Sequence, residues 1–240
     1  MPKVVVDLTQ VLPNGENGGA KIMVIELLKQ LSLLAPQYHF VLLTSYRAHE
    51  ELSILDSNNV ERICIFDKLP ELKRYRKYFT DLFKKIAEQI FPDHDGLLTE
   101  AKLDKDNVLK SFNADLLFCP FTEQIFPDSA LPRVTIIYDL QHLYYQHFFD
   151  ETQIFYRDKF FRDACLLSSQ IVCISDFVRS AVIKECGAID QKNIKTIHIA
   201  IKDRVANNFL NDKKELFLSK IGLSSNRFLF YPANFWKHKN

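Results

Sequence analysis

The sequence predicts an α/β protein with a Rossmann-like, doubly wound and mostly parallel sheet of about seven strands. Short apolar, β-branched runs alternate with amphipathic helical stretches along the chain, which is the pattern of strands joined by crossover helices. Glycine and proline mark several of the boundaries between them. One strand, beginning at Val134, is followed at once by polar and aromatic side chains. This is expected at the carboxyl edge of a parallel sheet, where open α/β sheets bind their ligands.

Length and composition allow one large α/β domain or two small ones. The 240 residues are 47% hydrophobic and 25% charged, which is ordinary for a soluble protein with an apolar core. The net charge of +1 gives no reason to expect nucleic acid as a partner. The apolar run after Lys3 ends at Asp7, too short for a signal peptide, and no run has the length of a transmembrane helix. We therefore expect a cytoplasmic protein, with any membrane contact peripheral and at the inner face of the membrane.

The cysteines predict reduced, buried thiols rather than disulfides. Their number is odd, no two form a CxxC pair, and most lie inside apolar runs, at positions 64, 119, 165, 173 and 186. Scattered cysteines of this kind are typical of cytosolic proteins. Neither the cysteines nor the histidines have the spacing of metal ligands, so we expect no metal site.

The first part of the chain predicts a strand–helix–strand–helix–strand unit, the opening of a doubly wound sheet. Asn14 and Gly15 form a turn in the loop after the first strand, and Pro36 ends the first helix. The predicted strands are 3–8, 40–44 and 60–66, and the predicted helices are 20–34 and 47–55.

The later part of the chain continues the alternation. Predicted strands are 114–119, 134–138, 170–174 and 194–199, and predicted helices are one ending near 112, then 152–167, 175–186 and 213–221. Ser175 is a good N-cap, and Gly187 and Gly222 favour helix ends. A further strand, 227–231, comes just before the last residue. We therefore expect residues 1–222 to form an N-terminal domain and residues 223–240 to be the hinge and first strand of an absent second domain.

Two positions predict a binding site. Asp139, Gln141 and His142 come directly after the strand from Val134, and directional hydrogen-bonding groups of this kind suit the hydroxyls of a sugar. The glycine pair 18–19 lies between the first strand and the first helix, where backbone N–H groups and the helix dipole suit a phosphate. The alternatives are a polar loop at the first position and a simple turn at the second.

These stretches resemble family 4 glycosyltransferases, which have the two-domain GT-B fold. The resemblance extends over nearly the whole chain and is carried by Gly18-Gly19, by Asp139-Leu140-Gln141-His142 with the aromatic residues that follow, by Ser175-Asp176-Phe177, and by Tyr231–Asn240. It implies that the chain is one half of a GT-B fold, the acceptor-side N-terminal domain.

The resemblance also implies a role for particular residues. Asp139 and His142 are the residues implied to make catalytic contacts with the transferred sugar. The sequence departs from the family pattern at Tyr138, because many relatives carry a histidine directly before the aspartate. The residues implied to bind the donor are Gly18, Gly19, Asn234, Lys237 and Lys239, and those implied to bind the acceptor are Gln141, Tyr144 and Ser175. For Ser175 the alternative role is a plain helix cap.

The basic segment 71–91 has two interpretations. Its apolar side chains fall on one helical stripe, and lysine and arginine occupy much of the rest. It is either an amphipathic helix on its own core with a solvated basic face, or a surface that docks on anionic lipid or binds the acceptor.

The function implied is transfer of a sugar, with retention, from a nucleotide diphosphate sugar to a hydroxyl of a glycan or lipid-linked acceptor. No cofactor beyond the nucleotide sugar is expected, and the chain alone would be inactive. One alternative is a non-enzymatic acceptor-binding domain or subunit that needs a separate donor-binding chain. Another is an unrelated nucleotide-dependent α/β enzyme, but the sequence has no complete phosphate-binding signature.

Overall fold

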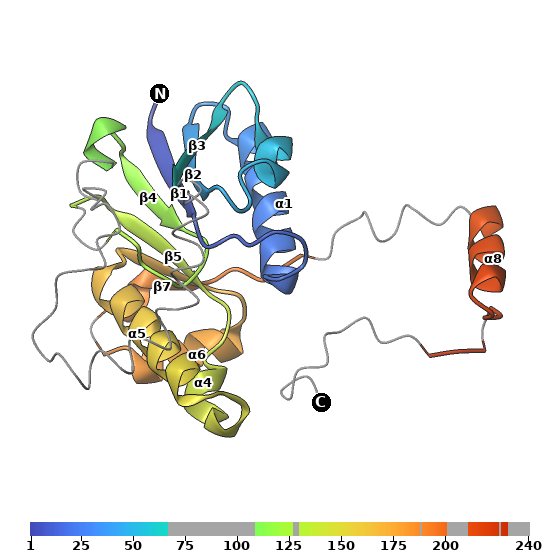
Figure 1. The fold of residues 1–240 in the computed structure, drawn as a ribbon. Helices are drawn as coiled ribbons and strands as arrows, with labels where there is room; N and C mark the ends of the chain where they lie inside the picture. The colour runs from blue at the N-terminus through green and yellow to red at the C-terminus, as the bar shows by residue number, and fades with distance from the viewer. Residues whose placement is uncertain (67–108, 127–129, 188, 201–210, 226, 230–240) are drawn as a thin grey trace, which may run out of the picture.

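The computed structural model describes residues 1–66, 109–126, 130–187, 189–200, 211–225 and 227–229. It contains a seven-stranded sheet with the order β3-β2-β1-β4-β5-β6-β7 (Figure 1). Every neighbouring pair of strands is parallel. This confirms the predicted fold class, an α/β protein with a Rossmann-like doubly wound sheet.

All seven strands that the sequence predicts before residue 200 are present. Their bounds are β1 (Lys3–Leu8), β2 (His39–Ser45), β3 (Val60–Phe66), β4 (Leu116–Cys119), β5 (Arg133–Ile137), β6 (Gln170–Cys173) and β7 (Ile194–Thr196). β7 is shorter than predicted, because beyond Thr196 only the bond from Ile197 N to Cys173 O, 2.9 Å, continues the pairing with β6. The strand predicted from Arg227 is absent over 227–229, and its remaining residues lie outside the described part of the chain.

The helices agree with the sequence prediction where they are long. They are α1 (Gly18–Leu34), η1 (Glu51–Leu55), α4 (Gln141–Tyr144), η2 (Gln146–Phe148), α5 (Glu151–Leu167), α6 (Asp176–Glu185), η3 (Gln191–Asn193) and α8 (Asn211–Lys220). The helix predicted over 47–55 is only the 3₁₀ turn η1. The turns α4 and η2 were not predicted, because three or four residues are too few to show a helical period.

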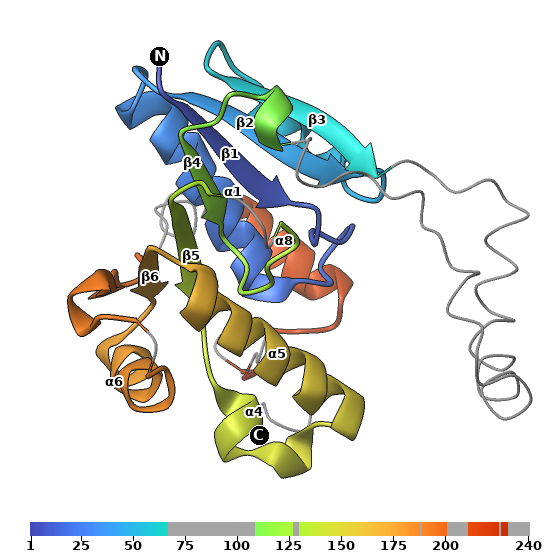
Figure 2. The ribbon, with the colours of Figure 1, turned by 90° about the vertical axis from the view of Figure 1, so that its left-hand side faces the viewer.

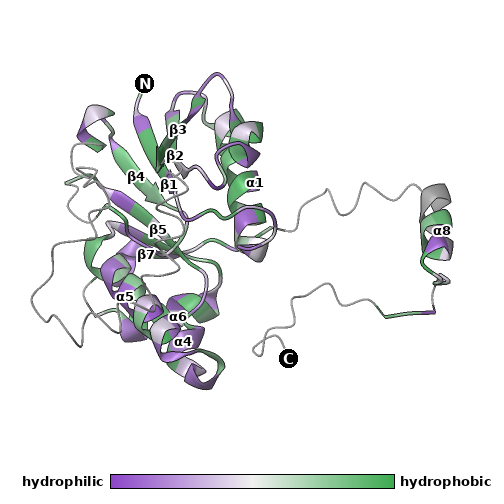
Figure 3. Cartoon of the chain, viewed as in Figure 1, coloured by the Kyte–Doolittle hydropathy of each residue, from purple (hydrophilic) through white to green (hydrophobic). Residues whose placement is uncertain are grey.

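The helices cover both faces of the sheet. On one face, Val24 and Leu28 of α1 pack in the same cluster as Val6 of β1. On the other face, Phe161 of α5 packs in a cluster with Ile137 of β5, together with α6 (Figures 1 and 2). Right-handed crossovers require this arrangement when strands are added in both directions from β1. Figure 3 shows hydrophobic residues along much of the strands and α1, and a more hydrophilic mixture along α5 and α6.

The connection from β4 to β5 is held by a buried arginine. Arg133 is 1% exposed and donates to Gln124 Oε1 at 2.9 Å and to the carbonyl of Phe126. Gln124 Nε2 donates in turn to Thr135 Oγ1 at 3.0 Å, and the hydroxyls of Thr135 and Ser168 lie 2.7 Å apart. The loop that leaves the carboxyl end of β4 is therefore fastened to β5 by hydrogen bonds that are shielded from water.

The prediction of five reduced cysteines is wrong for two of them. Cys165, near the end of α5, and Cys186, which follows α6, form a disulfide with a Cα–Cα distance of 5.7 Å. The two helices end side by side in one apolar cluster, a proximity that the spacing of cysteines in the sequence does not reveal. Cys64, Cys119 and Cys173 are not joined in disulfides. The cysteine content therefore no longer supports a cytoplasmic location.

Candidate functional site

The strand order reverses at β1 and β4. β2 and β3 lie on one side of β1, whereas β4 to β7 lie on the other. Ligands of doubly wound sheets bind at such a switch point, outside the carboxyl ends of the strands. Two loops begin at those ends here, residues 9–17 after β1 and residues 120–126 after β4. The candidate site is therefore built from these loops and from the residues that follow β5 and β6 along the same edge.

A buried carboxylate fixes the beginning of the first loop. Asp7, at 1% exposure, lies in β1. Its Oδ1 accepts from the amide of Thr9 at 3.1 Å and from the Thr9 hydroxyl at 2.6 Å, and its Oδ2 accepts from Gln10 Nε2 at 3.3 Å. Burial, and secondly the charge of Asp7, raise the pKa of the nearby Cys119 thiol. Cys119 is accordingly an un-ionised core thiol at neutral pH and not a nucleophile.

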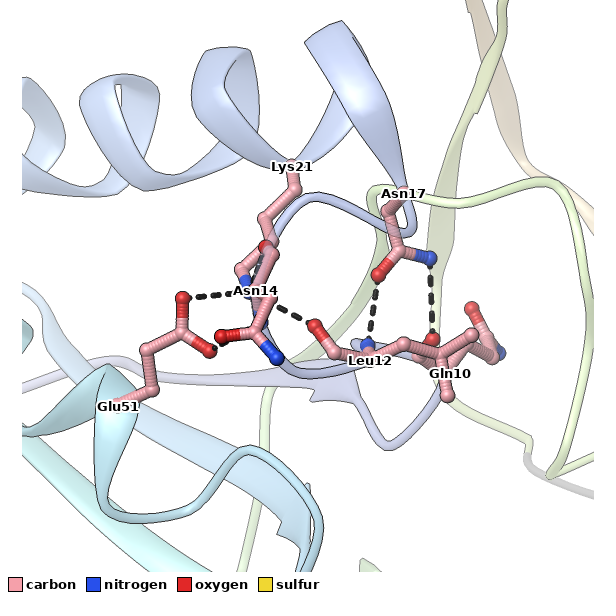
Figure 4. A network of polar contacts seen from close by, with 6 residues as sticks. All are labelled: Gln10, Leu12, Asn14, Asn17, Lys21 and Glu51. Carbon is pink, nitrogen blue, oxygen red and sulfur yellow. Dashed lines mark hydrogen bonds and ion pairs between the residues drawn. The ribbon is translucent and has the colours of Figure 1, made fainter. Parts of the chain in front are cut away.

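A buried lysine organises the middle of the same loop (Figure 4). The ammonium of Lys21, 4% exposed, donates to the carbonyls of Leu12 at 2.7 Å and Asn14 at 2.9 Å, and to Glu51 Oε1 at 2.6 Å. Glu51 Oε2 accepts from the amide of Asn14 at 3.1 Å. All three ammonium protons therefore have acceptors within the protein, so Lys21 shapes the loop rather than offering a charge to a ligand.

The start of α1 has no cap from its own N-cap side chain. The amide group of Asn17, the N-cap residue, instead crosses the loop: Oδ1 accepts from Leu12 N at 2.6 Å, and Nδ2 donates to Gln10 O at 3.2 Å (Figure 4). The first turn of α1 carries no acidic side chain. The first N–H groups of the helix and the positive end of its dipole thus meet neither a capping oxygen from Asn17 nor a first-turn carboxylate.

Gly18 and Gly19 form the first two residues of this helix, which begins two residues earlier than the sequence predicts. Gly18 has φ of +56°, a left-handed conformation that L side chains rarely adopt. A Cβ added at either glycine would have no atom within 4 Å, so open space lies beside this backbone. The geometry provides an approach for an anion at the switch point of the sheet.

Asp139 lies exposed just beyond β5. Its Oδ1 accepts from the amide of Gln141 at 3.2 Å and lies 3.8 Å from a guanidinium nitrogen of Arg157 on α5. Asp139 and Arg157 are 41% and 47% exposed. Only β4 separates β5 from β1, so the two strand axes lie roughly 10 Å apart. Asp139 and the glycine pair therefore share one edge of the sheet.

His142 differs from the exposed group that the sequence analysis expects. It is 3% exposed in α4, its ring meets Phe161 edge-on at 6.4 Å between centroids, and its Nε2 has no hydrogen-bond partner. Burial, and to a lesser degree the positive charge of Arg157, lower the pKa of His142, so the imidazole is neutral at pH 7. In this conformation the imidazole packs between α4 and Phe161 of α5 and is shielded from solvent.

The predicted acceptor residues lie on neighbouring elements. Tyr144 of α4 donates its hydroxyl to Glu185 Oε1 at 3.2 Å, which ties α4 to the end of α6. Ser175 accepts from the amide of Val178 at 3.2 Å and so caps α6. The Ser175 cap confirms the structural interpretation of this residue and leaves its contact with an acceptor a prediction. Gln141 is half-buried at the start of α4.

Tyr138 lies between β5 and Asp139. Its hydroxyl donates to the carbonyl of Pro120 at 2.8 Å, and burial raises its pKa. It therefore joins the ends of β5 and β4 as a neutral side chain. Asn234, Lys237 and Lys239 lie outside the described residues, and so does the segment 71–91.

Two residues of the site were missed by the sequence analysis. Lys21 looks like an exposed position of α1, and Arg157 like an ordinary helix arginine, because each role depends on partners far away in the chain. Over the part of the chain that the structure describes, no group of three acidic, histidine or cysteine side chains is arranged to hold a metal. Over the same residues, no helix is long and apolar enough to cross a membrane.

Comparison with known proteins gives limited information. No protein-family profile matches the sequence, and no curated protein matches it. Among solved structures, a UGT transferase from Siraitia grosvenorii, in complex with UDP, is similar with a TM-score of 0.43 and 8% sequence identity. The similarity covers 92% of this chain and 55% of that chain, so this chain spans about half the length of the transferase. A TM-score at this level assigns neither a family nor an activity.

Proposed function

We propose that this chain is the N-terminal, acceptor-side half of a retaining GT-B glycosyltransferase. The parent protein would transfer a sugar from a nucleotide diphosphate sugar to a hydroxyl of its acceptor. Support comes from the sequence resemblance in four stretches and from the doubly wound sheet, which three of them border: Gly18-Gly19, Asp139–His142 and Ser175–Phe177. The observation that carries the proposal is the start of α1, which lies at the switch point with no side-chain cap and with open space beside Gly18 and Gly19.

The proposed chemistry requires charge stabilisation and positioning more than a protein base. In retention by direct attack, the acceptor hydroxyl approaches on the face that the diphosphate leaves, so the departing phosphate carries the negative charge. Gly18 N already donates to the carbonyl of Gly15 at 2.9 Å, so the N–H groups that suit this charge are those from Gly19 onward. Asp139 is exposed along the same edge and is the group that we place against the transferred sugar. His142 is buried beneath it and acts as a positioning residue for α4.

Replacing Gly19 with valine is expected to weaken binding of inorganic pyrophosphate by roughly tenfold or more, because a branched side chain fills the space through which a phosphate approaches. ³¹P NMR titration of the purified chain measures this. Gly187→Val is the matched control, since a Cβ at Gly187 also meets nothing within 4 Å but the residue follows α6. Equal pyrophosphate affinity in wild type and Gly19→Val would remove the glycine pair from the donor site.

The isolated chain is expected to unfold cooperatively on heating and to show no turnover of nucleotide sugars. Its sheet is complete, but a donor-binding domain is not among the described residues. Circular dichroism melting and a release assay for UDP and GDP measure the two properties. Robust turnover of a nucleotide sugar by residues 1–240 would contradict the proposal that this chain is only one half of the enzyme. A reading frame that continues beyond Asn240 into a second Rossmann-like domain would favour the enzyme over a separate acceptor-binding subunit.

A further inference from the structure

Arg157 of α5 is positioned by an aromatic ring and a carboxylate. Its guanidinium carbon lies 4.7 Å from the centroid of the Phe149 ring, and its nitrogen lies 3.8 Å from Asp139 Oδ1. Stacking on an aromatic ring fixes the plane of a guanidinium and leaves its outward N–H groups available. The distance to Asp139 is longer than a hydrogen bond, so hydroxyl groups have room to bond to both partners at once.

Two aromatic residues, Tyr156 and Phe160, adjoin Arg157 on the surface of α5. Tyr156 and Phe160 are four residues apart on α5, so they share one stripe of the helix, and their ring centroids are 6.0 Å apart. Phe160 is also three residues from Arg157, which places these two on adjoining positions of the same surface. Tyr156 is 51% exposed. Figure 2 shows α5 running from the end of α4 and η2 back toward the sheet. The ring faces therefore continue the site at Asp139.

The charges of α5 are balanced. Lys159 pairs with Asp163, and Arg162 pairs with Asp158 at 2.7 Å, each within one turn of the helix. Arg157 has Asp139 as its opposite charge. The surface thus has no surplus of positive charge to attract an anionic lipid headgroup or a phosphate. A neutral ligand that offers both hydroxyl groups and an apolar face fits it.

We propose that Asp139, Arg157, Tyr156 and Phe160 form a subsite for a neutral sugar ring of a glycan acceptor. Asp139 lies between the two sugars: it faces the transferred sugar and accepts a hydrogen bond from the acceptor hydroxyl that attacks that sugar. The guanidinium of Arg157 donates to other hydroxyls of the acceptor, and the C–H face of its pyranose ring covers the aromatic stripe. The subsite rests on the proposed function and specifies its acceptor as carbohydrate. A bilayer is the weaker fit, because inserting this stripe into lipid would bury the charged pair beside it without water.

The binding experiment uses the purified chain and four neutral probes: maltotetraose, cellotetraose, mannotetraose and chitotetraose. Saturation-transfer difference NMR and calorimetry measure their affinities. We expect at least one to bind in the millimolar range. Tyr156→Ala is expected to weaken it roughly fivefold, through loss of the stacking ring. Arg157→Lys keeps the charge but loses the planar fork, and about tenfold weakening is expected.

Phe217→Ala is the matched control. Phe217 is an aromatic residue of α8, 62% exposed, whereas Phe155 packs edge-on against Tyr156 at 5.5 Å between ring centroids, so its replacement would disturb that ring. Replacing Phe217 should leave sugar affinity within twofold of wild type. Each variant is checked for an unchanged melting temperature. The subsite is overturned if none of the four sugars binds. It is also overturned if Tyr156→Ala and Arg157→Lys both bind sugar with the wild-type affinity.

Two further measurements separate this proposal from its rivals and from the proposed function. Co-sedimentation with neutral or anionic vesicles, lost in Tyr156→Ala, would identify a membrane surface and overturn the sugar subsite. Concentration-dependent dimers that Tyr156→Ala dissociates would assign the stripe to a second copy and overturn it as well. Pyrophosphate binding at Gly19 is independent of α5. If the chain binds pyrophosphate but none of the sugars, the subsite is refuted and the proposed donor site is retained.

Discussion

Replacing both Cys165 and Cys186 with alanine is expected to destabilise the folded chain by about 3 kcal/mol, which is typical of losing a cross-link over a loop of this size. The bond spans a sequence separation of 21 residues and joins the ends of α5 and α6. For a chain of this length the melting temperature should fall by roughly 6–12 °C. Differential scanning calorimetry measures the change.

Dithiothreitol provides the internal control for this prediction. Reductant should lower the melting temperature of the wild type toward that of the double alanine variant, and it should leave the variant itself unchanged. Cys64→Ser tests a half-buried thiol outside this disulfide, and it should keep the wild-type response. A wild type that melts at the same temperature with and without reductant would show that Cys165 and Cys186 are not joined in solution.

Replacing His142 with alanine is expected to cost about 2 kcal/mol of folding stability, because it leaves a cavity against Phe161 where the imidazole is 3% exposed. The wild type should also lose stability in acid. Burial and Arg157 lower the folded-state pKa of His142 below its usual 6.5, while Asp158 and Asp139 act in the opposite direction. The stabilising effect of the neutral ring is complete above pH 6.5. It is lost as the pH falls from there toward the folded-state pKa, since the unfolded chain takes up the proton first.

Urea unfolding at pH 7.5 and pH 5.5 measures both effects. His142→Leu retains much of the volume and removes the titrating group, so its stability should change less between the two pH values than that of the wild type. His147→Ala, an exposed histidine of η2, is the control and should keep the wild-type pH response. A His142→Ala protein with wild-type stability and lost sugar transfer in the full-length parent would instead show that the imidazole contacts the substrate directly.

The sequence by itself determined the sheet and the position of its edge. The runs Lys3–Leu8 and Val60–Phe66 are rich in apolar, β-branched residues and long enough to predict strands, and the structure has both with the same bounds. Gly18 was recognisable because a glycine pair between a strand and a helix has a local conformational reason, and its φ is indeed +56°. Asp139 was found for a similar reason, since it directly follows a buried strand.

Only the tertiary structure decided how side chains meet across the chain. Lys21 and Glu51 are 30 residues apart, and Cys165 and Cys186 are separated by 21, yet each pair is in contact. Local pattern cannot reveal such pairs, because their distance depends on how helices pack on the sheet. The burial of His142 also depended on the tertiary structure. Its polar neighbours in the sequence suggest an exposed group, whereas the fold of α4 over Phe161 turns the ring inward, where apolar contacts replace water.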